Sequence, residues 1–188
     1  MDIGEEFTGI YEDRINGRKV LIAFKNGKKD GVTKYFHENC QIALEIEYHD
    51  DMINGEMRVY DEFGSILMNA FYTNGALNGD MTTYYSNGMK QCASRYKAGY
   101  RDGTLITYDT FGDISTTSMW KNGKRNGTEQ VYYPKSLGGN IYSMTEYVDG
   151  QRHGKQIQYA RDGKVLTITT YKYDRAQEYP RKVYGNDV

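Results

Sequence analysis

Histidine and cysteine are the residues of this sequence that could support metal or nucleophilic chemistry. The histidines are His37, His49 and His153, and the cysteines are Cys40 and Cys92. A metal or catalytic site needs side chains that converge on one point. The sequence repeats with a period of 24 residues, and these histidines and cysteines occupy different positions within that repeat. We therefore expect them to lie apart in the fold. The sequence therefore predicts a protein that is not an enzyme, with no catalytic residues, no metal and no cofactor.

Glycine and aromatic residues recur along the chain at a fixed period. Glycines stand 24 residues apart at Gly31, Gly55, Gly79, Gly103 and Gly127. An aromatic residue follows each glycine five residues later, at Phe36, Tyr60, Tyr84, Tyr108 and Tyr132. A second aromatic column, again with a spacing of 24, contains Tyr48, Tyr72, Tyr96 and Trp120. A constant period of this size is typical of a repeat array, in which each unit contacts mainly its neighbours.

One repeat, from Gly79 to Gly103, indicates how the units fold. Alternating residues are followed by Asn87-Gly88, by a second strand that ends at Tyr96, and by a glycine-rich return. Asn-Gly supplies the positive φ angles that a tight hairpin needs, and we expect Gly103 to lie in such a turn. The predicted fold is all-β: an elongated, twisted antiparallel β-meander of 24-residue hairpin repeats, with about 13–15 strands.

The period also predicts how the chain is divided. Residues 1–25 are an irregular N-terminal capping hairpin, residues 26–171 are six hairpin repeats, and residues 172–188 are a C-terminal cap and frayed tail. Cys40 and Asp51 occupy slots that hold glycine in other repeats. The repeat that starts at Gly127 has three extra residues, which we place in a turn at 134–139. A turn tolerates such an insertion because lengthening a loop costs little.

Composition limits the function further. The net charge of −1 gives no general attraction to nucleic acid. The 19 tyrosines and 21 glycines favour a thin sheet lined by aromatic rings over a thick core. No apolar run approaches the length of a membrane span, and the first residues lack the apolar region of a signal peptide. We therefore expect a cytoplasmic protein with free thiols.

The two rows of turns differ in charge. In a meander, alternate turns collect at opposite margins of the sheet. The return turns carry the predicted partner-binding residues: Tyr100, Arg101, Lys124, Arg125 and Arg152, with Met52, Ile53 and Leu77 earlier in the chain. The hairpin turns carry acidic residues together with Phe63 and Phe111. Polar turns can be simply solvated, but arginine and tyrosine are also frequent anchors of protein interfaces. We expect the backbones of Arg101 and Arg125, rather than their guanidinium groups, to serve the fold.

The run Trp120-Lys-Asn-Gly123-Lys-Arg-Asn-Gly127 resembles the MORN motif. The period of 24 and the paired tyrosine columns are more similar to the divergent bacterial MORN-variant repeats of YwqK-type antitoxins. The resemblance covers about residues 24–171. It implies a cytosolic protein that binds a partner and neutralises a toxin.

Three functional hypotheses follow. The leading one is a non-enzymatic protein-binding repeat module, an antitoxin-like or immunity-like inhibitor of a toxin or a defence enzyme. The second is a MORN-type scaffold or a membrane-surface-associated protein, which needs cations and apolar wedges on one margin. The third is a structural β-sheet protein that self-associates through open edge strands.

Overall fold

The computed structural model describes residues 6–178 and 181–182, and these residues are mostly in β-strands. Seventeen strands are present in this part of the chain, together with one 3-10 turn, η1 (Lys135–Leu137), and no α-helix. The predicted all-β meander is therefore confirmed. Three strands have only two residues each, and they account for the excess over the predicted number. Residues 1–5, 179–180 and 183–188 of the predicted caps lie outside the described residues.

The chain divides into two compact units, and strand β9 (Lys90–Lys97) contributes to both. The first unit consists of residues 1–89 and 96–99, and the second of residues 90–95 and 100–188. The first contains β1 (Gly9–Ile15), β2 (Arg18–Lys25), β3 (Lys28–Lys29), β4 (Gly31–Phe36), β5 (Ile42–His49), β6 (Met52–Tyr60), β7 (Ile66–Thr73) and β8 (Ala76–Tyr84). The second contains β10 (Tyr100–Tyr108), β11 (Ile114–Lys121), β12 (Lys124–Tyr132), β13 (Ile141–Val148), β14 (Gln151–Tyr159), β15 (Val165–Lys172), β16 (Arg175–Ala176) and β17 (Arg181–Lys182).

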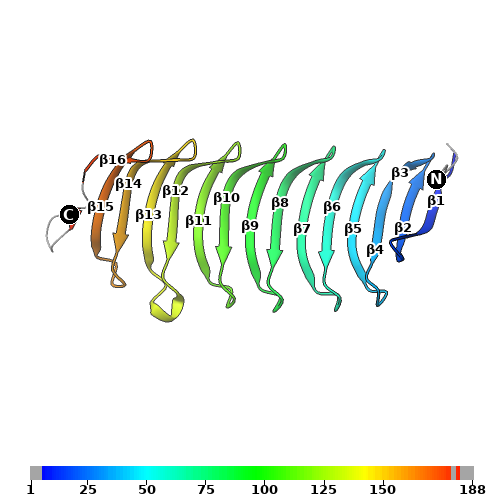
Figure 1. Cartoon of the computed structure of the whole chain (residues 1–188), viewed down its shortest axis with the longest axis horizontal. Coiled ribbons are helices and arrows are strands. Elements are labelled where there is room, and N and C mark those ends of the chain that lie inside the picture. The colour runs from blue at the N-terminus through cyan, green and yellow to red at the C-terminus, as the bar shows by residue number, and fades with distance from the viewer. Residues whose placement is uncertain (1–5, 179–180, 183–188) are drawn as a thin grey trace. The chain divides into compact units, whose positions relative to one another are not determined.

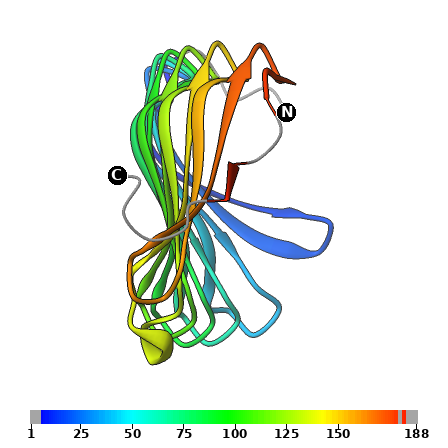
Figure 2. The ribbon, with the colours of Figure 1, turned by 90° about the vertical axis from the view of Figure 1, so that its left-hand side faces the viewer.

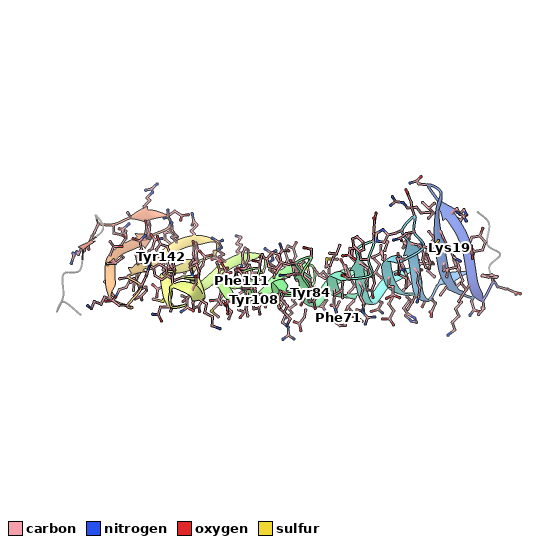
Figure 3. All side chains as sticks on the ribbon, turned by 90° about the horizontal axis from the view of Figure 1, so that it is seen from below. Lys19, Phe71, Tyr84, Tyr108, Phe111 and Tyr142 are labelled. Carbon is pink, nitrogen blue, oxygen red and sulfur yellow. The ribbon has the colours of Figure 1, made fainter. Side chains whose placement is uncertain are left out.

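Within each unit the long strands follow one another in sequence order, and neighbours pair antiparallel (Figure 1). Hairpin turns and return turns gather at opposite ends of the strands (Figure 2). In each unit the sheet is a single layer whose side chains project from both faces (Figure 3). The turns of a unit therefore form two separate rows, as the meander pattern predicts.

The return turns are two-residue connections with positive φ at both positions, as a type I′ turn requires. Asn74 and Gly75 have φ of 49° and 79°, and Asp51 has φ of 65° in the glycine slot. Each turn also hydrogen-bonds to the preceding repeat of its unit. The Gly75 N–H donates to the carbonyl oxygen of Ile53 at 2.8 Å, and the Gly123 N–H to that of Arg101 at 2.9 Å. These bonds fix the spacing of successive turns.

Gly103 has the expected positive φ, 124°, but it lies inside β10 and not in a turn. The next repeat shows why, because the register between β11 and β12 shifts. Ser118 pairs with Glu129 whereas Trp120 pairs with Arg125, so β12 bulges around Gly127, which has φ of 112°. The periodic glycine therefore marks a β-bulge, where a side chain would strain the backbone.

The buried residues are few, and most of them follow the period. In the first unit Val20, Ile22 and Phe24 of β2 form a small core with the partly buried rings of Tyr11 and Tyr35. One buried position recurs two residues before the second aromatic column. It holds Ile46 and Ala70 in the first unit, and Ser94, Ser118, Thr145 and Thr169 in the second. At this recurring position the buried residue thus changes from aliphatic in the first unit to hydroxyl-bearing in the second.

Candidate binding surface at the return turns

The predicted partner-binding residues lie beside return turns in both units. Met52, Ile53 and Leu77 begin β6 and β8 of the first unit. Tyr100, Arg101, Lys124, Arg125 and Arg152 begin β10, β12 and β14 of the second unit. Within a unit, the strands of successive repeats pair in a regular order, so residues at equivalent positions of neighbouring repeats lie in one row at the same end of the strands. The structure thus assembles two rows of residues, one mainly apolar and one mainly cationic.

The arginines of the second unit alternate with aromatic rings. The guanidinium carbon of Arg101 lies 5.2 Å from the centre of the Trp120 ring, and that of Arg125 lies 5.8 Å from the same ring. Arg125 also lies 5.2 Å from the centre of the Tyr147 ring. Such cation–π contacts hold a guanidinium in one place. These arginine heads therefore take part in the fold, contrary to the expectation that only their backbones do.

An acidic residue compensates Arg125 on the same face. The guanidinium of Arg125 pairs with the Glu129 carboxylate at 3.1 Å and donates to the Tyr147 hydroxyl at 3.3 Å. The Tyr147 hydroxyl in turn donates to Glu129 at 3.4 Å. Burial raises the pKa of Tyr147, and the negative charge of Glu129 adds to the increase. The Arg125 side chain still has 41% of its surface exposed, so it remains available to a partner.

Arg152 has a similar environment one repeat later. Its guanidinium carbon lies 4.1 Å from the centre of the Tyr171 ring, and its Nε pairs with Asp174 at 3.1 Å. The hydrogen bond to Asp174 raises the pKa of Arg152. Hydrogen bonds from the backbone N–H and the guanidinium of Arg152 lower the pKa of Asp174. Asp174 belongs to the next return turn, so this pair joins two successive turns.

Tyr100 and Lys124 are the more exposed members of the row. Tyr100 has 63% of its surface exposed although its ring lies over Gly123, where a Cβ would come within 3.2 Å of it. Lys124 is also exposed, and its Cβ would lie 3.8 Å from a Cβ on Gly150, which is an ordinary contact distance. Gly123 thus makes room for the ring of Tyr100, whereas Gly150 is not required by contact with Lys124.

The first unit has an apolar version of this row. Ile53 pairs with Tyr48 and Leu77 pairs with Tyr72 across their hairpins. Met52 is 47% exposed beside its turn. Burial raises the pKa of the Tyr48 hydroxyl, and the neighbouring Tyr35 raises it further. Met52, Ile53 and Leu77 carry no charge, but Lys29, one repeat before Ile53, places its Nζ 5.1 Å from the centre of the Tyr48 ring.

The residues considered for chemistry have local contacts. His37 Nε2 lies 3.0 Å from the Tyr60 carbonyl oxygen, and His49 Nδ1 lies 2.9 Å from Asp30. The His153 ring packs against Tyr173 with 4.6 Å between ring centres. Within residues 6–178 and 181–182, no three histidine, cysteine or acidic side chains gather as ligands of a metal ion.

Sequence reasoning missed the acidic partners of the arginine row. Glu129 follows Arg125 by four residues and Asp174 lies 22 residues after Arg152. Neither spacing matches the 24-residue period. For Glu129 the signal was the alternation within β12, which places residues 125 and 129 near each other across the bulge. For Asp174 it was the return-turn slot that Asp51 also occupies, because the Asp51 carboxylate accepts a hydrogen bond from the Lys29 N–H over the same spacing of 22 residues.

These observations define the class of protein: an array of antiparallel hairpin repeats that presents rows of turn residues. A family model described as MORN repeat variant matches residues 152–173, from the start of β14 to the return turn after β15. A comparison with curated proteins gives no match. Within the described part of the chain, no helix is long and apolar enough to cross a membrane. The repeat is typical of protein-binding or membrane-associated scaffolds.

Proposed function

We propose that the chain is a non-enzymatic, cytoplasmic protein-binding module that inhibits a partner protein in the manner of an antitoxin or immunity protein. The observation that carries this proposal is the row of stacked arginines beside exposed Tyr100 and Lys124. Arginine and tyrosine are over-represented among the residues that dominate binding energy. The target would be a toxin or a defence enzyme with an acidic surface.

Pre-organisation supports this role. Arg125 and Arg152 are held by rings and carboxylates, yet 41% and 35% of their side-chain surfaces stay exposed. Binding loses less conformational entropy when a long side chain is already fixed. Exposed Tyr100 adds a rigid ring with a polar tip to the same row. A row of this kind suits an extended protein surface better than a small molecule.

The environment of the Cys92 thiol also favours binding over catalysis. Burial raises the pKa of Cys92, although the charge of Arg101 acts in the opposite direction. A raised thiol pKa leaves little thiolate at neutral pH, and the thiolate is the nucleophile. No cofactor or nucleic acid enters the proposed function.

The first experiment measures capture of a partner from the native lysate by the full chain. We expect one stoichiometric protein to be retained by the wild type and lost by Tyr100→Ser and by Lys124→Glu. Both side chains are exposed, and both variants keep the arginines that stack in the fold. The control is Lys164→Glu, because Lys164 is 82% exposed in a hairpin turn of the same unit. Equal capture by Lys124→Glu and the wild type would contradict the proposed surface.

The second experiment tests inhibition. The captured protein is identified by mass spectrometry and expressed alone and together with the chain. We expect its expression alone to arrest growth, the wild type to restore growth, and Lys124→Glu to fail. If the partner does not arrest growth when it is expressed alone, and if its activity is unchanged in the complex, then the chain is not an antitoxin.

A membrane-surface scaffold is the second candidate, because exposed Lys121 and Lys124 stand beside exposed Tyr100 in the second unit. Cations and interfacial aromatic rings attract anionic lipid surfaces. Flotation with phosphatidylserine vesicles distinguishes the two. Binding to vesicles that Lys124→Glu abolishes, without a protein partner, would favour the scaffold.

A further inference from the structure

The insertion at 134–139 is anchored to the turns on both sides of it. It forms η1 and ends at Gly138 and Gly139, which have φ of 106° and 70°. Lys135 pairs with Asp113 of the preceding hairpin turn at 3.2 Å. Directly after the insertion, the Asn140 side chain donates to the carbonyl oxygen of Arg161 in the following hairpin turn at 2.8 Å. The insertion and the residue that follows it therefore contact both neighbouring hairpin turns of the row (Figure 2).

A hollow of about 480 Å³ lies between this insertion and the turn that joins β10 to β11. Its lining consists of Asp109, Phe111, Asp113, Pro134, Lys135 and Ser136. The volume falls within the range of about 300–1,000 Å³ that is usual for ligand pockets. Phe111 is 84% exposed, and Figure 3 labels it in the second unit. The phenyl ring of Phe111, which lines the hollow, is thus in contact with solvent.

The turn holds Phe111 in a defined position. The Asp109 carboxylate accepts hydrogen bonds from the backbone N–H groups of Phe111 and Asp113, at 2.9 and 3.0 Å. A side-chain acceptor of this kind fixes a tight turn. The phenyl ring is therefore presented by an ordered backbone.

The charges of the hollow are unbalanced. Lys135 pairs with Asp113, and 76% of the Lys135 side chain is in solvent, compared with 33% of the Asp113 side chain. Asp109 forms no salt bridge with any lysine or arginine among the described residues. The lining therefore has an excess of one negative charge, next to an apolar wall. A ligand with an apolar group beside a cation complements it.

We propose that this hollow binds an extended peptide segment of a partner protein. An aromatic or large aliphatic side chain of the segment packs against Phe111 and Pro134, and an adjacent lysine or arginine pairs with Asp109. The hollow lies at the hairpin turns, at the other end of the strands from the return-turn row. The binding therefore goes beyond the proposed function and does not depend on it.

The first unit offers a matched control. In the turn between β6 and β7, Asp61 accepts hydrogen bonds from the N–H groups of Phe63 and Ser65, at 2.9 and 2.8 Å. Phe63 is 92% exposed. The hairpin turn one repeat later, at 85–89, carries no insertion. Phe63 is thus an equally exposed phenyl ring on the same kind of turn, without the wall that completes the hollow.

The experiment selects random peptides displayed on phage against the full chain, with counter-selection against Phe111→Ser. A synthetic peptide from the selection is then titrated by fluorescence polarisation. We expect selected peptides to contain an aromatic or aliphatic residue beside a lysine or arginine. Phe111→Ser should weaken binding at least tenfold, whereas Phe63→Ser should change it less than twofold. Asp109→Asn should reduce both the affinity and its dependence on salt. Circular dichroism melts identify variants with altered folding.

Several outcomes would overturn the proposal. Selection that enriches no peptide, or enriches acidic ones, excludes the stated ligand. If Phe63→Ser and Phe111→Ser lose binding equally, the peptide adheres to any exposed phenyl ring and does not recognise the hollow. If Asp109→Asn unfolds the turn, the pairing is tested instead by replacing the cation of the peptide with glutamine, and undiminished affinity contradicts it. A dimer in sedimentation that Phe111→Ser dissociates would assign the hollow to a second copy of the chain.

Discussion

Each periodic glycine lies against a side chain eight residues earlier in the sequence. A Cβ on Gly79 would come within 3.0 Å of the Cβ of Phe71, and one on Gly103 within 3.4 Å of that of Arg95. At Gly55 the added atom would overlap the carboxylate of Glu47, which accepts a hydrogen bond from the Glu56 N–H at 3.1 Å. Glycine is therefore required for two reasons: a side chain would collide with its neighbour, and the backbone has a positive φ.

Gly55→Ala should destabilise the chain more than Gly75→Ala does. At Gly55, φ is 124° and the added methyl displaces the Glu47 carboxylate. The expected loss in the free energy of unfolding is about 2–3 kcal/mol. At Gly75, φ is 79° and nothing lies within 4 Å of the new atom, so only about 1 kcal/mol is expected. Urea unfolding of both variants measures the difference. Equal losses would show that the close contact contributes nothing.

At the scale of the strands, polar clusters connect neighbours across one face of the first unit. Glu45 of β5 pairs with Lys34 of β4 at 3.1 Å and accepts a hydrogen bond from the Tyr60 hydroxyl of β6 at 2.9 Å. Burial alone would raise the pKa of Glu45, but the hydrogen bonds from Tyr60 and Lys34 outweigh it, so the pKa is lowered. The positive charge of Arg58 acts in the same direction as these bonds.

Glu45→Gln should reduce stability at neutral pH by about 1 kcal/mol. Because folding lowers the pKa of Glu45, its ionised form contributes stability above the pKa of the unfolded chain. That contribution disappears as the pH falls through the lower pKa of the folded chain. Thermal melts of the wild type and the variant should therefore converge between about pH 5 and pH 3. A difference that stays constant over this range would refute the assigned pKa shift.

The stacked row is the corresponding feature of the second unit. Trp120 lies between the guanidinium groups of Arg101 and Arg125, and its indole N–H donates to the buried Ser118 hydroxyl at 2.8 Å. Trp120→Ala should lower the free energy of unfolding by about 3 kcal/mol, since both stacking and a buried hydrogen bond are lost.

The control for this prediction is Met119→Ala on the opposite face of β11. Met119 is 52% exposed, so its truncation should cost less than about 1 kcal/mol. Chemical denaturation compares the two variants. A loss of less than half a kcal/mol for Trp120→Ala would mean that the ring and arginines do not support the sheet.

At the scale of the whole chain, each described strand contacts mainly its sequence neighbours, and among residues 6–178 and 181–182 no thick core joins distant repeats. Stability in such an array is approximately a sum of repeat and neighbour contributions. Within the described residues the cluster of Val20, Ile22 and Phe24 in β2 packs against the rings of Tyr11 and Tyr35, which lie in the adjacent strands β1 and β4. Damage to one repeat should therefore remain local.

Val20→Ala tests this expectation. Val20 is only 1% exposed, and losing two methyl groups should cost about 2 kcal/mol. Hydrogen exchange should accelerate in β2, β4 and β5, while β12 to β14 keep their protection. Faster exchange of equal size in both groups of strands would indicate that the chain unfolds as one cooperative body instead.

The sequence alone determined the all-β meander, the hairpin and return turns, and their positive φ angles, with the exception of the turn expected at Gly103. It placed Cys40 and Asp51 correctly in glycine slots, where both have φ of 65°. These features are local, because a turn of a few residues depends on the conformations that those residues tolerate. Because the sequence repeats with a fixed period, the same turn conformations recur along the chain.

Only the tertiary structure decided what the side chains do between the turns. In the structure Gly103 lies in a bulge and not in the expected turn. Arg125 lies between Trp120 and Tyr147, beside Glu129. The tertiary structure also set the insertion against Phe111. Such contacts depend on which residues face each other across strands, and a bulge changes that register without changing the sequence period.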